Sequence, residues 1–284
     1  MWLKNLVKKY FLILKVRNRF SAQVQITQRQ LYHYYRDRLV SGHSLPLSET
    51  GFRVFSQFEE DGMLLYVFSV IGMGSKTFVE IGSDDGINSN CANLAFNFGW
   101  SGLFVDSNPE SIRRGQRFYA KYPHPWMYQP QFRCAAVSPD NVNDLLSSNG
   151  MTGEIELLSI DIDGDDYWIW NAIEAIQPKV VVIETHVRFG FNNIVVPYGR
   201  SSSTDFATHH GASPIAMVKL GKQKGYKLIG ANQLGFNFIF LKNTLAVIEL
   251  PEVVVQDVLR HPSVTKSIRE FKMTGEREYI TPIP

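Results

Sequence analysis

The stretch FVEIGSDDGINSN (residues 78–90) determines how the rest of the sequence is interpreted. Its apolar start is typical of a buried strand. The strand pattern stops at Gly82, and a polar turn that ends at Gly86 leads into a segment that can form a helix. A strand, a glycine-bounded turn and a helix in this order are the unit from which parallel sheets are built.

The same alternation of strand and helix patterns continues along the chain. We expect strands at residues 77–82, 102–106, 131–138, 155–163, 179–185, 226–233 and 236–242. We expect helices at residues 55–72, 87–99, 108–122, 141–148, 165–176 and 213–225, the fifth closed by Pro178. The alternation predicts a parallel sheet with helices on both faces. The short Leu234-Gly235 connection predicts that the last two strands are antiparallel, because a parallel crossover needs a dozen residues or more.

The predicted fold class is therefore α/β: a Rossmann-like, doubly wound, mostly parallel seven-stranded sheet with a C-terminal antiparallel β-hairpin. The chain has 284 residues, of which 44% are hydrophobic and 20% charged, which suits one large domain or two small ones. We expect a basic amphipathic N-terminal helix and linker at residues 1–50, the sheet domain at 51–245 and a C-terminal extension at 246–284.

Charge is distributed unevenly along the chain. Residues 1–40 carry nine Lys or Arg and one Asp, a charge of +8, so the total of +2 leaves −6 for the rest. In residues 1–20 apolar side chains recur at helical spacing with lysines opposite. Such a helix would lie on anionic lipid, or it would pack on the body or on a second subunit. An acidic body makes nucleic acid an unexpected partner.

The sequence shows neither a membrane-spanning run nor the apolar core of a signal peptide. No apolar run approaches the roughly 18 residues that span a bilayer, and residues 10–14 are too few for a signal-peptide core. We therefore expect a cytoplasmic protein that can lie peripherally at the inner membrane face. Cys91 and Cys134 fit no metal-binding spacing, and we expect both to be buried, reduced thiols.

The turn after the first strand is the first candidate for a binding site, because ligands of doubly wound sheets bind beyond the carboxyl ends of the strands. Glycines at 82 and 86 let the backbone take positive φ angles and approach a ligand closely. Asp84 and Asp85 would repel the diphosphate of a dinucleotide and suit a cationic ligand. S-adenosylmethionine (SAM) carries both an ammonium and a sulfonium group. An ordinary strand–helix turn is the alternative interpretation.

Asp106 follows the second strand, twenty positions after Gly86. A carboxylate there can accept two hydrogen bonds from ribose hydroxyls, as in nucleotide-binding βαβ units, or it can simply cap the next helix. The turn and Asp106 together predict a nucleoside ligand, SAM. The predicted donor-binding residues all lie at strand ends or in the turns that follow: Glu80, Gly82, Ser83, Asp84, Gly86, Asn90, Asp106, Ser107, Ala136 and Asp161.

Four segments together resemble the FkbM-type methyltransferase family: SQFEEDGMLLYVF (56–68), FVEIGSDDGINSN (78–90), GWSGLFVDSNP (99–109) and LLSIDIDGDDYWIW (157–170). The resemblance covers about residues 55–245. It implies a class I methyltransferase fold, SAM as the methyl donor and a hydroxyl acceptor on a sugar or polyketide. It matches Glu80, Gly82 and Gly86 to the donor turn, Asp106 to the ribose and Asp161 to the acid after the fourth strand. The chain departs from the family pattern D-x-E-G, because it has Asp163 in place of the Glu.

The segment DIDGDD (residues 161–166) places four carboxylates at the end of one strand, and Glu184 and His186 close the next. Removing the proton of a hydroxyl acceptor during methyl transfer requires a base or a cation. We predict His186, Asp161 and His210 as catalytic residues. We predict Asp161, Asp163 and Glu184 as ligands of Mg²⁺, a candidate second cofactor. Asp165 and Asp166 are expected to cap the following helix.

The insertion at residues 187–210 is expected to be a substrate loop or lid. Its aromatic residues and Trp168 can stack on a sugar or pack on one another.

The predicted function is SAM-dependent O-methylation of a hydroxyl on a sugar, glycolipid or related metabolite, by a protein that can be oligomeric. The alternatives are a non-catalytic glycan-binding or scaffold protein with the same fold, and a methyltransferase that acts on nitrogen or nucleic acid. A nicotinamide oxidoreductase would need a third glycine in the turn.

Overall fold

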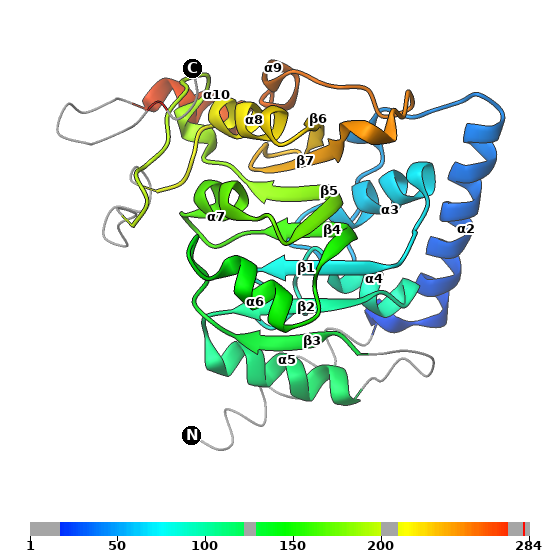
Figure 1. Cartoon of the computed structure of the whole chain (residues 1–284). Helices are drawn as coiled ribbons and strands as arrows, with labels where there is room; N and C mark the ends of the chain where they lie inside the picture. The colour runs from blue at the N-terminus through cyan, green and yellow to red at the C-terminus, as the bar shows by residue number, and fades with distance from the viewer. Residues whose placement is uncertain (1–17, 122–128, 200–209, 272–280, 282–284) are drawn as a thin grey trace.

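The computed structural model describes residues 18–121, 129–199, 210–271 and 281. Its centre is a seven-stranded sheet in the order β3-β2-β1-β4-β5-β7-β6 (Figure 1). The strands are β1 Thr77–Ile81, β2 Ser101–Asp106, β3 Gln131–Cys134, β4 Gly153–Ile160, β5 Ile176–Glu184, β6 Tyr226–Ala231 and β7 Asn237–Lys242. Strands β1 to β5 pair in parallel, so their carboxyl ends meet at one edge, on the left of Figure 1.

The last two strands form the predicted hairpin. Strand β7 pairs antiparallel with β5 on one side and with β6 on the other. This arrangement returns β6 to the direction of β1 to β5, and only β7 runs against it. The prediction of a doubly wound, mostly parallel, seven-stranded α/β sheet with a C-terminal antiparallel hairpin is confirmed.

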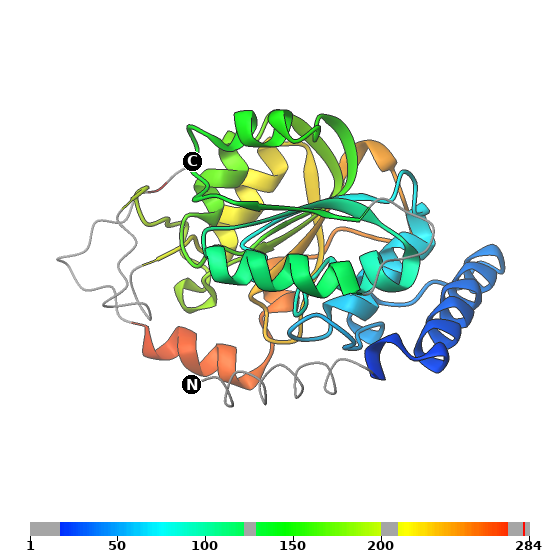
Figure 2. The same ribbon diagram turned by 90° about the horizontal axis from the view of Figure 1, so that it is seen from below.

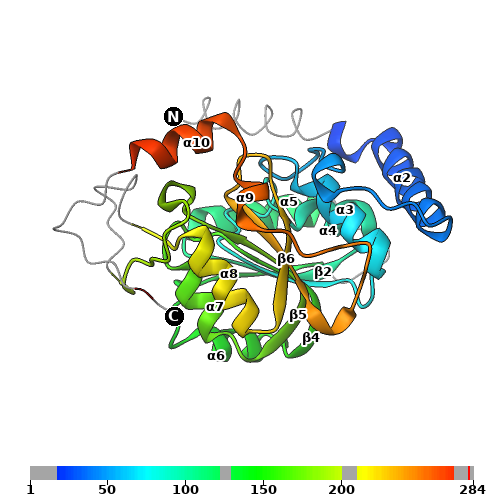
Figure 3. The ribbon, with the colours of Figure 1, turned by 90° about the horizontal axis from the view of Figure 1, so that it is seen from above.

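Helices cover both faces of the sheet, as the views from below and above show (Figures 2 and 3). Their bounds are α2 Ala22–Val40, α3 Glu60–Ile71, α4 Ala92–Phe98, α5 Pro109–Lys121, α6 Val142–Ser148, α7 Asp166–Ala172, α8 Pro214–Gln223, α9 Val255–Val258 and α10 Pro262–Glu270. Helices α3, α4 and α5 bury their apolar side chains on one face, against Phe78 and Val182 among others. Helices α6, α7 and α8 cover the other face, where Val79 and Ile183 lie. No described helix is long and apolar enough to cross a membrane.

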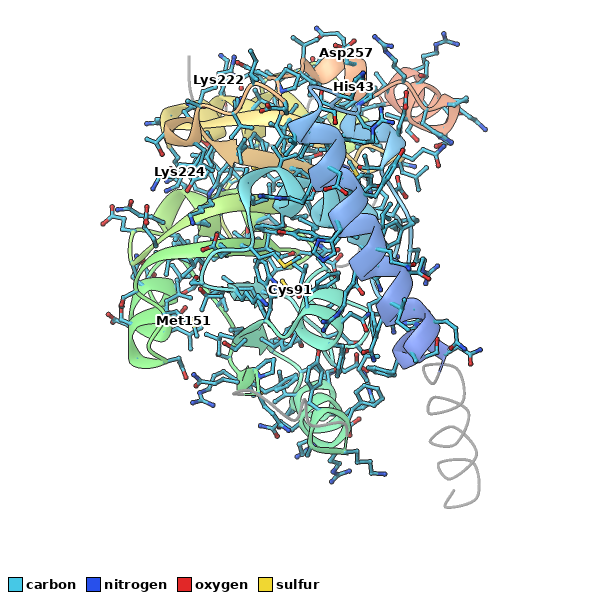
Figure 4. All side chains as sticks on the ribbon, turned by 90° about the vertical axis from the view of Figure 1, so that its right-hand side faces the viewer. His43, Cys91, Met151, Lys222, Lys224 and Asp257 are labelled. Atoms are coloured by element: carbon cyan, nitrogen blue, oxygen red, sulfur yellow. The ribbon has the colours of Figure 1, made fainter. Side chains whose placement is uncertain are left out.

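Helix α2 lies along the right-hand side of Figure 1 and faces the viewer in Figure 4. The sequence patterns did not predict it, and it packs on α3, where the rings of Tyr35 and Tyr66 lie 5.1 Å apart. The predicted basic helix at residues 1–20 lies largely outside the described residues. Its end is described: Phe20 packs edge-on against Phe96, with ring centroids 4.7 Å apart.

The segment after α2 is packed on the body. Leu47 is buried in the short 3₁₀ turn Leu47–Glu49, directly over β6. A Cβ atom on Gly230 would stand 2.8 Å from the Leu47 side chain. The stretch predicted as a linker therefore contributes to the core. At the other end of the chain, Val255, Leu259 and Val264 also join a core cluster, so the predicted C-terminal extension packs against the sheet domain.

Two local predictions are wrong. Pro178 does not close a helix, because α7 ends at Ala172 and Pro178 lies within β5, paired with Ile155. Proline is tolerated there because β7 pairs with β5 only from Val180 onward, so no ladder bond is lost on that side. Of the two cysteines, Cys91, which is labelled in Figure 4, is buried, whereas Cys134 is exposed at the end of the outer strand β3.

Candidate functional site

The predicted site residues gather at the carboxyl edge of the sheet, and the register of the strands explains how. Side chains alternate between the two faces of a strand, so residues two apart share a face. Val182 belongs to the core on the α3–α5 face, and Glu184 follows two positions later on the same face. Leu157 shares that core, which places Asp161 on the same side. The carboxylates after β4 and β5 thus project together at one corner.

Position 82 in the turn after β1 has to be glycine, because the backbone at Asp161 passes directly beside it. Gly82 has a φ of 83°, and a Cβ atom there would stand 1.6 Å from the carbonyl oxygen of Asp161. The N–H of Asp161 donates to the carbonyl of Ile81 over 2.9 Å, which continues the β1–β4 ladder past the end of β4. Only glycine fits this contact, and the backbone on the ligand side of the turn is left without a side chain.

Asp106 is joined to the glycine turn by a backbone hydrogen bond. Its Oδ2 atom accepts from the N–H of Asp84 over 2.8 Å, and Oδ1 accepts from the N–H of Asn108 over 2.7 Å. Each carboxylate oxygen can accept two hydrogen bonds, so one site on each oxygen is left for a ligand. The side chain is half-exposed at the strand end. The helix-capping alternative is not what the structure shows: Asn108 caps α5 by accepting from Glu110.

The glycine turn is less negatively charged than its sequence predicted. Arg114 of α5 donates from Nε to Asp85 over 2.6 Å and from Nη2 to Asp84 over 3.1 Å. One guanidinium thus offsets half of the formal charge of these two carboxylates. Asp85 also accepts from the N–H of Ile87. Both carboxylates are therefore ion-paired, and the turn keeps one net negative charge where the sequence predicted two.

Glu80 is buried and shapes the start of α4. Its two oxygens accept from the Ser89 hydroxyl and from the N–H groups of Asn90 and Cys91, at 2.9 to 3.0 Å. Burial raises the pKa of the Glu80 carboxyl, and these hydrogen bonds oppose that shift. The structure gives Glu80 the role of fixing the loop that follows the turn. Its predicted contact with the donor stays a prediction.

Three further predicted donor residues contribute to the same loops. Asn90 is buried and donates to the Ser159 hydroxyl over 3.1 Å. The carbonyl of Ser107 lies 3.6 Å from the Cys134 thiol, and the carbonyl of Ala136 accepts from Asn141. Ser83 is different, because its hydroxyl is buried and has no hydrogen-bond partner within the described residues. A buried hydroxyl in this state is suited to bind a ligand.

The loop after β4 is held by Asp166. One oxygen of this buried carboxylate accepts from the N–H of Ile162 over 2.9 Å and the other from the N–H of Gly164 over 3.0 Å. Burial raises the pKa of Asp166 to about 6 despite these bonds. Asp166 therefore closes the loop upon itself. Asp165, which stands at the start of α7, makes no side-chain capping bond to the helix.

Asp161, Asp163 and Glu184 come together as predicted: their carboxylate oxygens lie within 4.8 Å of one another. Burial, reinforced by the charges of Asp166 and Asp163, raises the pKa of Asp161 to about 8. Burial and the charge of Asp161 raise the pKa of Glu184 well above its ordinary value. This corner is the part of the edge where a positive charge would be stabilised.

The two predicted histidines are brought together although 24 positions separate them. The rings of His186 and His210 lie 4.5 Å apart, and the ring of Phe189 lies 4.4 Å from that of His186. Backbone bonds fix the arrangement, because the N–H of His186 donates to the carbonyl of Ala212 over 2.8 Å. His210 is buried and His186 is half-buried. An ideal Cβ atom on Gly211, the residue after His210, would lie 3.4 Å from the Cβ of His186 and 3.9 Å from the carbonyl oxygen of Gly164, in the loop after β4.

The loop beyond His186 is anchored to the body on one side and exposed on the other. The Trp168 indole donates to the carbonyl of Val196 over 2.9 Å. Phe189 is fully buried and packs on Phe271, so it belongs to the core and is not available to a ligand. Phe191 and Tyr198 are exposed, at 51% and 46%. Of the aromatic residues described in residues 187–199, these two are exposed.

The sequence patterns did not single out two buried acids in the first turn of α3, Glu60 and Asp61. Glu60 Oε1 accepts from the side-chain amides of Asn232 and Asn237, which ties α3 to the β6–β7 hairpin. Asp61 Oδ2 accepts from three successive N–H groups, those of Val54, Phe55 and Ser56. The acid pair Glu60-Asp61 was the available signal, because acids at a helix start often bind backbone or neighbouring donors.

A cavity of about 510 Å³ lies beside β6, away from the glycine turn. Its walls are largely apolar and come from the segment at Leu45 to Ser48, from β6 and from the chain around Leu250 and Val253. Asn232 lines this cavity and is also bonded to Glu60. Strand β7 lies between β6 and β5, so one strand separates this cavity from the carboxylates at the ends of β4 and β5.

Comparison with known proteins gives only distant likenesses. No protein-family model and no curated protein matches the chain, so the resemblance to the FkbM-type family stays a prediction. Among solved structures, a putative caffeoyl-CoA O-methyltransferase from Staphylococcus aureus is 15% identical with a TM-score of 0.43; the match covers 83% of this chain and 99% of that one. A SAM-dependent methyltransferase from Clostridium acetobutylicum is 8% identical with a TM-score of 0.41, over 75% and 98% of the two chains.

The bifunctional kinase-methyltransferase WbdD is 12% identical with a TM-score of 0.38, over 59% of this chain. The match spans only 34% of the WbdD chain. Likenesses of this size leave the class of the protein to be judged from its own sheet. In that sheet β1 to β5 are parallel, and the antiparallel strand β7 lies between β5 and the edge strand β6. This arrangement defines a Rossmann-like α/β protein.

Proposed function

We propose that the protein is a SAM-dependent O-methyltransferase that acts on a hydroxyl of a sugar, a glycolipid or a related metabolite. The observation that carries the proposal is the bond between Asp84 and Asp106, which joins the glycine turn after β1 to the acid after β2. This bond holds the backbone of the turn next to a carboxylate with free acceptor sites, at the carboxyl edge of the sheet. Nucleosides bind α/β sheets at this place, with the acid on the ribose.

The residues present fit SAM at three points. Asp106 would hold the ribose hydroxyls, and the backbone around Gly82 would approach the donor without a side chain in between. The buried Ser83 hydroxyl, which has no partner in the described part of the chain, would gain one. Asp161 and Glu184, whose carboxyl pKa values are raised by burial and by neighbouring carboxylates, form a place at this edge where a nearby positive charge of the donor would favour the ionised carboxylates.

When bound, SAM supplies an electrophilic methyl group, and the protein has to position an acceptor oxygen and take its proton. The His186–His210 pair lies near the acidic loop at the strand ends. We assign His186 as the first general base, with His210 as the second candidate and Asp161 as a group that touches donor or acceptor. A neutral imidazole near pH 7 is suited to this task, because its ordinary pKa lies close to that pH. The methyl transfer itself requires no metal ion, and Mg²⁺ is a separate proposal.

A carbohydrate acceptor is proposed because of the exposed aromatic rings beside the site. Phe191 and Tyr198 project from a loop that Trp168 anchors to α7. Aromatic faces bind the apolar faces of sugar rings through buried contact area. Replacing both Phe191 and Tyr198 by Ala is expected to raise the KM for a sugar acceptor without changing SAM affinity.

The cellular location is a further proposal: cytoplasmic, with peripheral contact at the inner membrane face through the basic N-terminal residues. The structure refines the deletion that tests it. Residues 1–17 can be removed, but Arg19 and Phe20 should be kept because Arg19 bonds to Asn88 and Phe20 packs on Phe55. The truncated chain should bind anionic liposomes more weakly than the full chain. Equal binding would exclude these residues as the membrane contact.

The test of the proposed function is ligand binding to the full chain. Thermal unfolding is followed with SAM, with its demethylated product and with NAD, each in separate samples. A ligand at about 100 times its dissociation constant adds about 2.7 kcal/mol to the free energy of unfolding. We expect stabilisation by SAM and by its product but not by NAD. Stabilisation by NAD alone would favour an oxidoreductase, and no stabilisation by any of the three would favour a non-catalytic protein.

A further inference from the structure

The carboxyl edge of β4, β5 and β7 contains an arrangement of oxygen atoms that methyl transfer does not itself need. We propose that Asp161, Asp163, Glu184 and the side-chain amide oxygen of Asn237 form a binding site for one hard divalent cation, Mg²⁺ or Ca²⁺. The three carboxylates already lie within 4.8 Å of one another. Acidic groups often cluster without an ion, so the proposal depends on the fourth residue.

Asn237 lies directly opposite Glu184 in the antiparallel β5–β7 pair. Residues that face each other in such a pair project to the same side of the sheet, with Cβ atoms about 4.5–5.5 Å apart. Ile239 and Leu241 of the same strand belong to the core on the α3–α5 face, which confirms the side for Asn237. Asp161 follows β4 on that face. Asp161, Glu184 and Asn237 therefore form one row across three adjacent strands.

The amide of Asn237 is oriented by its other end. Its Nδ2 group donates to Glu60 over 2.8 Å, and the carboxylate of Glu60 is held in turn by the amide of Asn232. The residue is 4% exposed, and its Oδ1 atom has no hydrogen-bond partner within the described residues. A buried amide oxygen without a donor is a rare and costly state. Beside Glu184, a cation would satisfy it.

The chemistry of the four groups selects the ligand. All are oxygen donors, which favour Mg²⁺, Ca²⁺ and related hard ions over the softer metals that prefer thiolate or imidazole. Among the ion pairs of the described residues, none joins a Lys or Arg to any of the three carboxylates. A divalent ion would relieve the repulsion between them. Four protein oxygens leave open positions on such an ion for water.

The site does not depend on the proposed methyl transfer, so it is tested without SAM. The full chain is treated with a chelator, dialysed, and titrated by calorimetry with MgCl₂ and, separately, with CaCl₂. We expect saturable binding of one ion per chain for at least one salt. Asp163→Asn should weaken binding at least about tenfold, and Asn237→Ala should weaken it by a similar factor. Asp163 is exposed, so its variant is expected to fold.

The matched control is Asp144→Asn, which removes an exposed carboxylate on α6 and should leave the affinity unchanged. If Asn237→Ala lacks the circular dichroism spectrum of the folded chain, Glu184→Gln replaces it and is expected to weaken binding by the same order. Absence of saturable heat with both salts would overturn the proposal. So would an affinity that Asp163→Asn leaves unchanged, or one that a folded Asn237→Ala leaves unchanged. Calorimetry with SAM on Asp163→Asn separates a failure of this site from a failure of the donor site.

Discussion

The carbonyl oxygen of Asp161 lies where the side chain of any residue other than glycine at position 82 would begin, 1.6 Å from an ideal Cβ on Gly82. This contact joins the glycine turn after β1 to the loop after β4 that carries Asp163. A change at either residue is therefore transmitted directly to the other. The spacing of these two loops therefore depends on this backbone contact.

Gly82→Ala should consequently be far more damaging than its φ angle alone implies. Gly225 provides the matched control, because its φ of 85° is nearly the same as the 83° of Gly82 and no atom lies within 4 Å of its ideal Cβ. We expect Gly225→Ala to lower the free energy of unfolding by about 1–2 kcal/mol from backbone strain. Gly82→Ala should lower it by more than about 4 kcal/mol. Equal losses in urea denaturation would mean that the contact with Asp161 is relaxed in solution.

The histidine pair gives a prediction on activity. His186→Gln should reduce methyl transfer at least about a hundredfold, because a positioned base contributes about 10²–10⁴ to the rate. SAM affinity measured by calorimetry should stay the same. Transfer is measured with methyl-labelled SAM and a panel of glycolipids. His33→Gln, an exposed change on α2, is the control that should retain full activity.

His210→Gln separates the roles of the two rings. If His186 is the base and His210 positions it, His210→Gln should lower kcat less and shift the pH at which activity appears. The ring of His210 lies 4.5 Å from that of His186, so its removal changes the surroundings of the base. Full activity with an unchanged pH profile in both variants would remove the pair from the mechanism.

Asp61 makes stability depend on pH. Burial raises its pKa to about 6 from the ordinary value of 3.8, although three backbone N–H groups bond to the carboxylate. The folded chain therefore binds this proton more tightly than the unfolded chain. The resulting stability is fully present below pH 3.8 and is lost as the pH rises through 6. Between about pH 4.5 and 7.5 this group should lower the free energy of unfolding by about 2 kcal/mol.

Asp61→Asn keeps an oxygen for the three N–H groups and removes the titration. The fall in stability between those two pH values should be smaller in the variant by about 2 kcal/mol, measured by urea denaturation at each pH. Asp144→Asn should leave the pH dependence as it is. A pH dependence that is identical in wild type and Asp61→Asn would show that Asp61 titrates normally in the folded chain.

Much of the fold could be predicted because it depends on local pattern. Apolar runs located all seven strands, and the short connection at Leu234-Gly235 correctly predicted that β7 runs antiparallel to β6. Element ends were less predictable. Helix α4 starts only at Ala92 because Glu80, from the preceding strand, binds the N–H groups of residues 90 and 91. A contact of this kind leaves no periodic signal.

The site could be predicted in part for the same reason. Strand ends converge in any parallel sheet, so Asp161 and Glu184 were expected to meet, as they do. Arg114 comes after β2 in the sequence, whereas Asp84 and Asp85 come before it, so their ion pairs could be found only from the three-dimensional structure. The pairing of Asn237 with Glu184 likewise depends on the register of β7, which the sequence does not reveal.

The central claim is that a SAM molecule binds at the turn after β1 with its ribose on Asp106. Isothermal titration calorimetry of SAM into the full chain and into Asp106→Asn tests it most directly. The account predicts one site per chain, and an affinity at least about tenfold lower in Asp106→Asn, a loss of about 1.4 kcal/mol or more. Circular dichroism confirms that the variant is folded. Absence of saturable heat in the wild type, or equal affinity in a folded Asp106→Asn, would contradict it.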